Sequence, residues 1–219
     1  MASKNSEQKV ALVAGGTGLV GSHVIQELAT SNKYKLVKVL VRKPMPIHYN
    51  SKIEYILFDY DQPIASALVA DDVYCCLGTT MKKAGSKEAF YKVDFEYPFK
   101  IAQLALAGGA KRFAIITAMG ANKKSLIYYN RVKGEIEDAL SKLSYEALLI
   151  FRPSLLLGNR SESRFGEKAG EVLSKLFSFA IPKKYQGIEA SKVAKAMVAI
   201  TASQVTGKLI YESDVLQEF

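Results

Sequence analysis

The sequence predicts an α/β fold, in which a mostly parallel, doubly wound β-sheet carries helices on both faces. Short apolar, β-branched runs alternate along the chain with helical patterns, and a glycine-rich turn directly follows the first of these runs. The chain has 219 residues, of which 49% are hydrophobic, and this content excludes a disordered protein. We expect one domain with a single core over residues 1–219.

The strands and helices of this fold follow from the hydrophobic pattern. The strands are expected at Val10–Ala14, Leu36–Val41, Ile53–Phe58, Val73–Leu77, Phe113–Thr117, Ala147–Phe151 and Lys208–Tyr211. The helices are expected at Leu19–Ala29, Lys87–Ala107 and Tyr128–Leu143, and Ile188–Ala199 reads as a strand end followed by a helix. Pro98 lies inside the second helical segment, so it should kink or split that helix.

Two stretches fall outside the alternating pattern. Residues 1–8 are polar with no apolar run before Val10, so we expect a flexible tail there and not a signal peptide. Ser154–Tyr185 joins a polar run to an amphipathic segment and is the candidate for a small C-terminal substrate lid over residues 154–185.

Closely spaced glycines join the first expected strand to the first expected helix. Gly15 allows a sharp reversal, Gly18 lets the backbone approach a pyrophosphate, and Gly21 lets the helix sit close to the strand. The spacing also fits the GxGxxG form that begins at Gly16, and an ordinary glycine-rich turn is the alternative. The stretch predicts a dinucleotide-binding turn of the Rossmann type. Its expected cofactor contacts are Gly15, Thr17, Gly18, Leu19, Val20 and Gly21.

The residues after the second and third strands indicate which dinucleotide binds. In NAD-preferring sites, an acidic residue after the second strand binds the ribose 2′-hydroxyl. Here Arg42 and Lys43 stand in that place, and Arg42 could form two hydrogen bonds to a 2′-phosphate and stack on the adenine. We therefore expect NADP(H) to be preferred over NAD(H). Asp59 is placed to accept from the adenine amino group, or it simply ends its strand.

Tyr129 and Lys133 form a Tyr-x-x-x-Lys pair on one face of an expected helix. A neighbouring ammonium favours the phenolate and lowers the pKa of a tyrosine from about 10. Tyr129 would then protonate a carbonyl oxygen as hydride arrives, while Lys133 also holds ribose hydroxyls. An exposed tyrosine on a surface helix is the alternative. Tyr34 and Lys38 repeat the spacing, but they flank an expected strand, where four residues span about 13 Å.

Thr117 is the third candidate for the catalytic site. It ends an expected strand, where its hydroxyl would hydrogen-bond the substrate carbonyl or else satisfy backbone groups. Ala118, the next residue, carries no hydroxyl.

These motifs, in this order, resemble the short-chain dehydrogenase/reductase superfamily and its atypical and extended branches. More narrowly, the chain resembles the Tat-interacting-protein-like NAD(P)-binding group and its bacterial relatives. The segments that carry this closer resemblance are Leu77–Thr80, Lys83–Gly85, Val132–Glu135, Phe151–Pro153 and Glu162–Arg164. The resemblance implies a Rossmann core with bound NADP(H). It also implies that Leu77, Gly78 and Thr79 lie beside the nicotinamide half and that Pro153 and Ser154 lie near the ring.

The resemblance implies an NADPH-dependent oxidoreductase that reduces a small carbonyl substrate by hydride transfer. Two positions depart from the superfamily pattern: many members have a catalytic serine at Ala118, and Asp94 aligns with a helix-kinking asparagine. The alternative is an NADP(H)-binding sensor or regulatory protein with little or no turnover. Whether the chain is an enzyme stays open, and so does a homo-oligomer or a regulatory protein partner.

The formal net charge is +9, and the positions of the basic residues indicate what kind of ligand the protein binds. The doublets Arg42–Lys43, Lys82–Lys83 and Lys123–Lys124 each follow an expected strand and indicate a basic rim for an anionic ligand, or a solvated surface. No nucleic-acid-binding motif accompanies the charge, so nucleic acid is a minor hypothesis. No segment approaches the roughly 18 apolar residues of a membrane span, and we expect no metal site. Adjacent Cys75 and Cys76 read as reduced and structural, which favours the cytoplasm.

Overall fold

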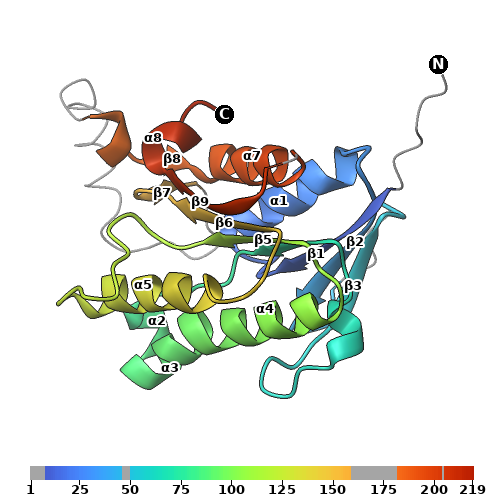
Figure 1. The fold of residues 1–219 in the computed structure, drawn as a ribbon, viewed down its shortest axis with the longest axis horizontal. Helices are drawn as coiled ribbons and strands as arrows, with labels where there is room; N and C mark the ends of the chain where they lie inside the picture. Colours follow the sequence, from blue (N-terminus) through green and yellow to red (C-terminus); the bar gives the residue numbers. More distant parts are fainter. Residues whose placement is uncertain (1–7, 46–49, 159–181, 204) are drawn as a thin grey trace.

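The computed structural model describes residues 8–45, 50–158, 182–203 and 205–219. In this part of the chain, seven parallel strands form one sheet in the order β3-β2-β1-β4-β5-β6-β9 (Figure 1). The order reverses between β1 and β4, and ligands of open α/β sheets bind at the carboxyl ends of the strands at such a point. The strands are β1 (Lys9–Ala14), β2 (Tyr34–Val41), β3 (Ile53–Leu57), β4 (Asp72–Cys75), β5 (Arg112–Ile116), β6 (Ala147–Arg152) and β9 (Gly207–Glu212).

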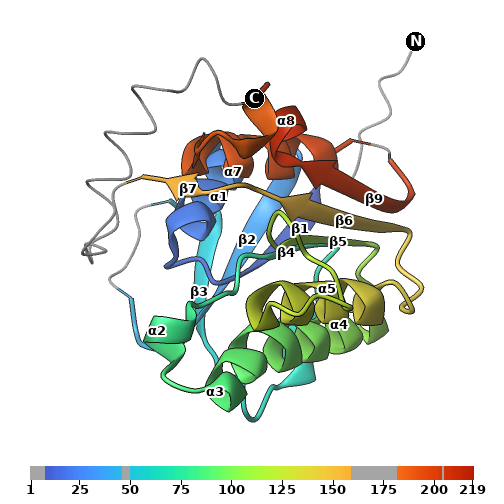
Figure 2. The same cartoon turned by 90° about the vertical axis from the view of Figure 1, so that its left-hand side faces the viewer.

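Helices cover both faces of this sheet, so the predicted fold class is confirmed. α1 (Leu19–Thr30) and α7 (Ala190–Thr201) lie on one face, and α4 (Tyr97–Ala107) and α5 (Tyr128–Leu140) lie on the other (Figure 2). Each face has its own core because successive strand residues point to opposite sides. Along β1, Val13 packs under α1 and α7, whereas Leu12 packs under α4 and α5.

Short elements complete the described chain. They are the helices α2 (Met81–Ala84), α3 (Lys87–Tyr91) and α8 (Ser213–Leu216), the 3-10 turns Ala65–Leu68 and Lys183–Tyr185, and a small parallel sheet of β7 (Leu156–Leu157) and β8 (Ile188–Glu189). Most of the expected lid, residues 159–181, lies outside the described residues, as does most of the expected tail, residues 1–7. Among the residues that the structure describes, every helix is too short or too polar to span a bilayer.

The long helical segment predicted over Lys87–Ala107 is split, as expected from Pro98. α3 passes into a π-helical turn at Lys92–Glu96 before α4 begins at Tyr97. Pro98 lies in the first turn of α4 and has no N–H to donate to a carbonyl one turn earlier. The turn widens the helix where Asp94 lies, and π-helical turns of this kind occur often at functional sites.

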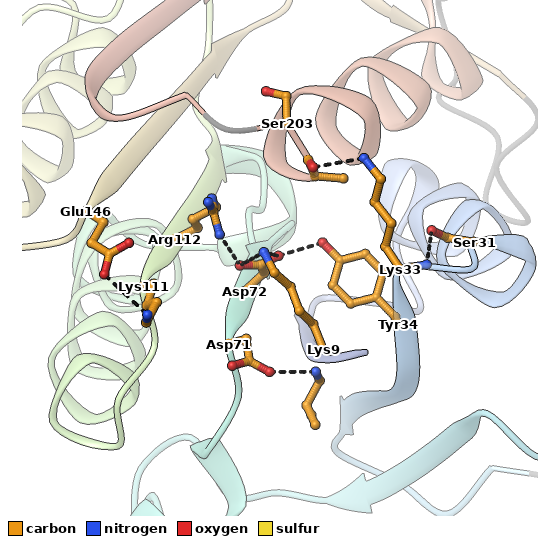
Figure 3. A network of polar contacts seen from close by, with 12 residues as sticks. Lys9, Ser31, Lys33, Tyr34, Asp71, Asp72, Lys111, Arg112, Glu146 and Ser203 are labelled. Carbon is orange, nitrogen blue, oxygen red and sulfur yellow. Dashed lines mark hydrogen bonds and ion pairs between the residues drawn. The ribbon is translucent and has the colours of Figure 1, made fainter. Parts of the chain in front are cut away.

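A polar network joins the amino-terminal ends of the four central strands (Figure 3). The fully buried carboxylate of Asp72 on β4 accepts from the Tyr34 hydroxyl at 2.7 Å and pairs with Lys9 at 3.0 Å and Arg112 at 3.4 Å. The Tyr34 hydroxyl also lies 2.8 Å from that of Tyr74. Because these residues come from β1, β2, β4 and β5, the network holds the strands in register at the edge opposite the glycine turn.

Candidate cofactor and active site

The glycine turn between β1 and α1 has the geometry that the sequence predicts. Gly15 has φ +80°, and a Cβ there would lie 2.6 Å from the carbonyl carbon and oxygen of Cys76. A Cβ on Gly21 would overlap the carbonyl oxygen of Gly15, so α1 can approach the turn only without a side chain. Gly16 is less restricted, because its Cβ would meet only side-chain atoms, the nearest being Val39 Cγ1 at 2.7 Å. Gly18 is exposed, and its nearest obstacle is the Gly15 oxygen at 3.2 Å.

The start of α1 can receive an anion. Gly18 is the N-cap and supplies no side chain, the first turn has no acidic residue, and the N–H of Ser22 is bonded to the Gly18 oxygen at 3.0 Å. The earlier N–H groups of a helix have no partner within it, and its amino end carries a partial positive charge. Thr17, in the turn, is exposed beside Gly18. These features fit the pyrophosphate of a dinucleotide.

Arg42 and Lys43 are exposed directly after β2, where the sequence places them. The buried side chain of Tyr60 responds to groups at both the glycine turn and the end of β2. Burial raises the pKa of Tyr60, and the nearby Cys75 adds to this rise. A hydrogen bond from the Gly15 backbone and the positive charge of Arg42 act in the opposite direction. No sequence motif signalled Tyr60 as a residue of this region.

Asp59 takes part in a turn after β3. One of its carboxylate oxygens accepts from the N–H of Asp61 at 2.8 Å, and its side chain is exposed. This contact fits the alternative of an aspartate that ends its strand. The adenine contact of Asp59 stays a prediction.

Lys133 and Tyr129 lie on α5, and Tyr129 is the tyrosine that faces Lys133. The half-buried Tyr129 ring packs 5.6 Å from the Phe90 ring, and Tyr129 helps to raise the pKa of Lys133. Tyr128 instead donates from its hydroxyl to the Lys87 carbonyl at 2.9 Å. Tyr34, which has the same spacing to Lys38, instead donates its hydroxyl proton to the Asp72 carboxylate.

Gly134 lets the loop before α5 cross close to the helix. A Cβ at this position would overlap the backbone of Asn122 and Lys123. The neighbouring Lys123 pairs with Asp138 on α5 at 2.5 Å. The sequence places Gly134 in the Val132–Glu135 motif without showing why a glycine is required.

Lys133 is buried in an ion pair with Asp94. Its Nζ lies 2.7 Å from Asp94 Oδ1, and the two side chains are 6% and 0% exposed. Burial alone would lower the pKa of Lys133, but Asp94 and then Tyr129 outweigh it, so the pKa lies above its usual value. Asp94 Oδ2 accepts from the N–H of Thr79 at 2.9 Å, and a Cβ on Gly78 would lie 3.5 Å from both charged groups. The pair therefore lies directly beneath the chain that leaves β4.

Thr117 does not fit the expected role of a carbonyl-positioning residue. Its side chain is 4% exposed, and its hydroxyl donates to Glu137 Oε1 at 2.6 Å. Glu137 is in turn paired with Arg152, whose other guanidinium nitrogen reaches Glu212 at 3.1 Å. A hydroxyl that donates to this carboxylate cannot also donate to a substrate carbonyl, because it has one proton. The observed role of Thr117 is to join β5 to α5.

Pro153 and Ser154 lie where the chain leaves β6 at the same edge of the sheet. The Pro153 carbonyl accepts from the N–H of Met119 at 3.0 Å. The Ser154 hydroxyl donates to the Gln186 carbonyl and accepts from Ser213 at 2.9 Å. Ser154 thereby joins the end of β6 to the region around β8 and α8. The nearness of these residues to the nicotinamide ring stays a prediction.

The comparisons with known proteins agree with this geometry. A model of the NAD(P)H-binding family matches residues 15–204. The chain belongs to the NAD(P)H-binding family. It is 32% identical over 211 residues to Protein HTATIP2 of Rattus norvegicus, covering 93% of this chain and 85% of that protein. It is also 32% identical over 205 residues to the mitochondrial Protein FMP52 of Candida albicans, covering 90% of each.

Solved structures share the fold of this NAD(P)H-binding protein. MoeE5 in complex with UDP-glucose and NAD superposes with a TM-score of 0.71 at 13% identity, covering 94% of this chain and 79% of that one. The PhqB reductase domain from Penicillium fellutanum superposes with a TM-score of 0.67 at 16% identity, covering 94% and 68%. At these identities the likeness shows the fold alone.

Proposed function

We propose that this family member binds NADPH and reduces a small carbonyl compound, with Tyr129 as the proton donor. One continuous arrangement carries the proposal. The glycine turn lies against the backbone of Cys76 and Leu77 at Gly15, and the next residue, Gly78, lies over Lys133. A cofactor stretched from the start of α1 along the exit of β4 would therefore reach the Tyr129 face of α5.

Tyr129 and Lys133 have separate roles in the proposed reaction. When bound, NADPH would supply a hydride for the carbonyl carbon, and Tyr129 would donate a proton to the carbonyl oxygen, which would give an alcohol and NADP⁺. Lys133 would hold the ribose hydroxyls and stabilise charge on the phenol oxygen. Tyr129 regains its proton from water.

Arg42 and Lys43 support a preference for NADPH over NADH. Both side chains are exposed directly after β2, at the carboxyl edge of the sheet where the glycine turn also lies. A guanidinium there can form paired hydrogen bonds to a 2′-phosphate. Titration of both cofactors by nucleotide fluorescence tests this point: Arg42→Ala should weaken NADPH binding by about tenfold and leave NADH binding nearly unchanged. Tighter binding of NADH by the wild type would refute it.

Turnover of a panel of aldehydes and ketones tests the chemistry. Tyr129→Phe should abolish NADPH oxidation and retain cofactor affinity. Tyr128→Phe, the matched control, should keep turnover, because the Tyr128 hydroxyl bonds to the Lys87 carbonyl. Turnover that survives Tyr129→Phe would refute the mechanism.

A second candidate function is an NADP(H) sensor with little turnover, and the contacts of Thr117 and Ala118 favour it. The hydroxyl of Thr117 is bonded to Glu137, and Ala118 has none, so neither residue offers a donor to a substrate carbonyl. Tight NADPH binding without turnover on any carbonyl would favour the sensor. Ala118→Ser, which restores a hydroxyl after β5, would then be expected to raise turnover.

We propose a cytoplasmic location and a small, anionic carbonyl substrate. The substrate proposal rests on the exposed lysines of α2, Lys82 and Lys83, and on exposed Lys124 in the loop before α5. The location rests on Cys75 and Cys76, both free thiols. The FMP52 relatives are named mitochondrial, so fractionation of cells that express a tagged protein is the test.

A further inference from the structure

Asp94 and Lys133 form a deeply buried ion pair at the carboxyl edge of the sheet. The two charged atoms are 2.7 Å apart, and neither side chain is more than 6% exposed. Asp94 comes from the π-helical turn, whereas Lys133 comes from α5. Two charges removed from water at this distance attract each other far more than a surface pair does.

Asp94 also holds the backbone that leaves β4. Its second carboxylate oxygen accepts from the N–H of Thr79 at 2.9 Å. One carboxylate therefore connects Lys133 with the Leu77–Thr80 segment, and Gly78 leaves the space between them free of a side chain. A cofactor bound along this segment would meet Lys133 in a position that Asp94 sets.

We propose that Asp94 is a positioning residue that keeps Lys133 as a fixed ammonium beneath Gly78, and that NADPH binding at alkaline pH depends on this pair. The second part rests on the proposed function, whereas the first part does not.

Without Asp94, Lys133 would be a buried amine with no carboxylate beside it. Burial disfavours a charged amine and lowers its pKa, and here the carboxylate reverses that effect. The other groups that act on Lys133 are Tyr129 on its own helix and Cys75 on β4. Burial raises the pKa of the Cys75 thiol to about 12, so Cys75 supplies no negative charge near neutral pH. Asp94 is therefore the carboxylate that keeps the ammonium charged.

The sign of the pH effect follows directly. With Asp94 present, the raised pKa keeps Lys133 protonated well above neutral pH. In Asp94→Asn the shape of the side chain and its bond to Thr79 are kept, but burial is no longer opposed, so Lys133 loses its proton at a lower pH. A purely structural role for Asp94 would instead weaken binding equally at every pH.

Two measurements test the proposal on the full chain. The first follows the Cε and Nζ signals of Lys133 by heteronuclear NMR as pH rises, without cofactor, and uses Lys133→Met to assign the signals. The second measures the Kd for NADPH between about pH 7 and about pH 9, a range below the ordinary lysine pKa. Wild type, Asp94→Asn and Asp138→Asn are compared. Asp138→Asn is the matched control, because it removes one carboxylate from an exposed ion pair on α5.

We expect Lys133 to titrate above the ordinary lysine value in the wild type and in Asp138→Asn, and below it in Asp94→Asn. The Kd of Asp94→Asn should rise by about tenfold or more across this range, whereas the other two proteins change little. A wild-type Lys133 that titrates at or below the ordinary value would overturn the proposal, even if Asp94→Asn does not fold. Equal titration of Lys133 in wild type and Asp94→Asn, or a loss of affinity independent of pH, would also overturn it. Failure of the wild type to bind NADPH would refute the proposed function, and the NMR titration would still decide the role of Asp94.

Discussion

Replacing Asp72 with asparagine should destabilise the fold without touching the cofactor site. Asp72 is fully buried at the amino-terminal edge of the sheet and pairs with Lys9 and Arg112 (Figure 3). Asp72→Asn keeps an oxygen that can accept from Tyr34 but removes the charge. The two cations then lose their partner, and the Arg112 side chain is only 13% exposed.

The expected loss in the free energy of unfolding depends on how deeply Asp72 and its two cationic partners are buried. Breaking a buried ion pair by removing one partner costs about 3 to 5 kcal/mol. Lys9 is 31% exposed and can turn to water, so we expect the lower end, about 3 kcal/mol. For a domain of this size, that loss lowers Tm by roughly 6 to 12 °C.

Urea and thermal unfolding followed by circular dichroism measure this loss. Glu146→Gln is the control: its carboxylate lies 3.6 Å from Lys111 in an exposed pair, so its loss should cost at most about 1 kcal/mol. Asp72→Asn should bind NADPH like the wild type at temperatures where both are folded. A loss in Asp72→Asn no larger than that in Glu146→Gln would refute the reasoning.

The other predictions concern the opposite edge of the sheet. Gly15→Ala should destabilise the protein and abolish NADPH binding, because φ is +80° and the new Cβ would lie 2.6 Å from backbone; Gly18→Ala should fold nearly normally and weaken only NADPH binding, in thermal melts and fluorescence titrations. Thr117→Val should cost about 1 kcal/mol of stability, through the lost bond to Glu137, and leave NADPH affinity unchanged; a selective loss of turnover would instead revive its role as a positioner of the substrate carbonyl. Cys75 should resist alkylation at about pH 8 until the protein unfolds, since burial raises its pKa to about 12, and rapid labelling of the folded protein, read by mass spectrometry, would contradict its burial.

Much of the fold could be predicted because buried parallel strands read as continuous apolar runs. The seven strands of the sheet lie where these runs occur, although β2 begins two residues earlier than expected and β4 ends two residues earlier. The ends shift because strand boundaries depend on the neighbouring strand: β4 ends at Cys75, which pairs with Ala14 at the end of β1, and β2 begins at Tyr34, which pairs with Lys9.

The candidate site was predictable where its residues are close in the sequence. The glycine turn lies within one strand–helix junction, and Tyr129 and Lys133 are one helical turn apart. Thr117, by contrast, has its partner far away in the sequence. Its hydroxyl bonds to Glu137, twenty residues away on a different element, and nothing in the local pattern shows where a strand-end hydroxyl points.

The sequence by itself determined the strand–helix alternation, the dinucleotide turn and the Tyr129–Lys133 pair, because each depends on local periodicity or on a backbone shape that glycine permits. Only the tertiary structure decided which polar groups meet. Asp94 pairs with Lys133, and Thr117 donates a hydrogen bond to Glu137. Each contact joins residues from separate elements. Burial makes such contacts strong, and burial is a property of the packed fold and not of the residue type.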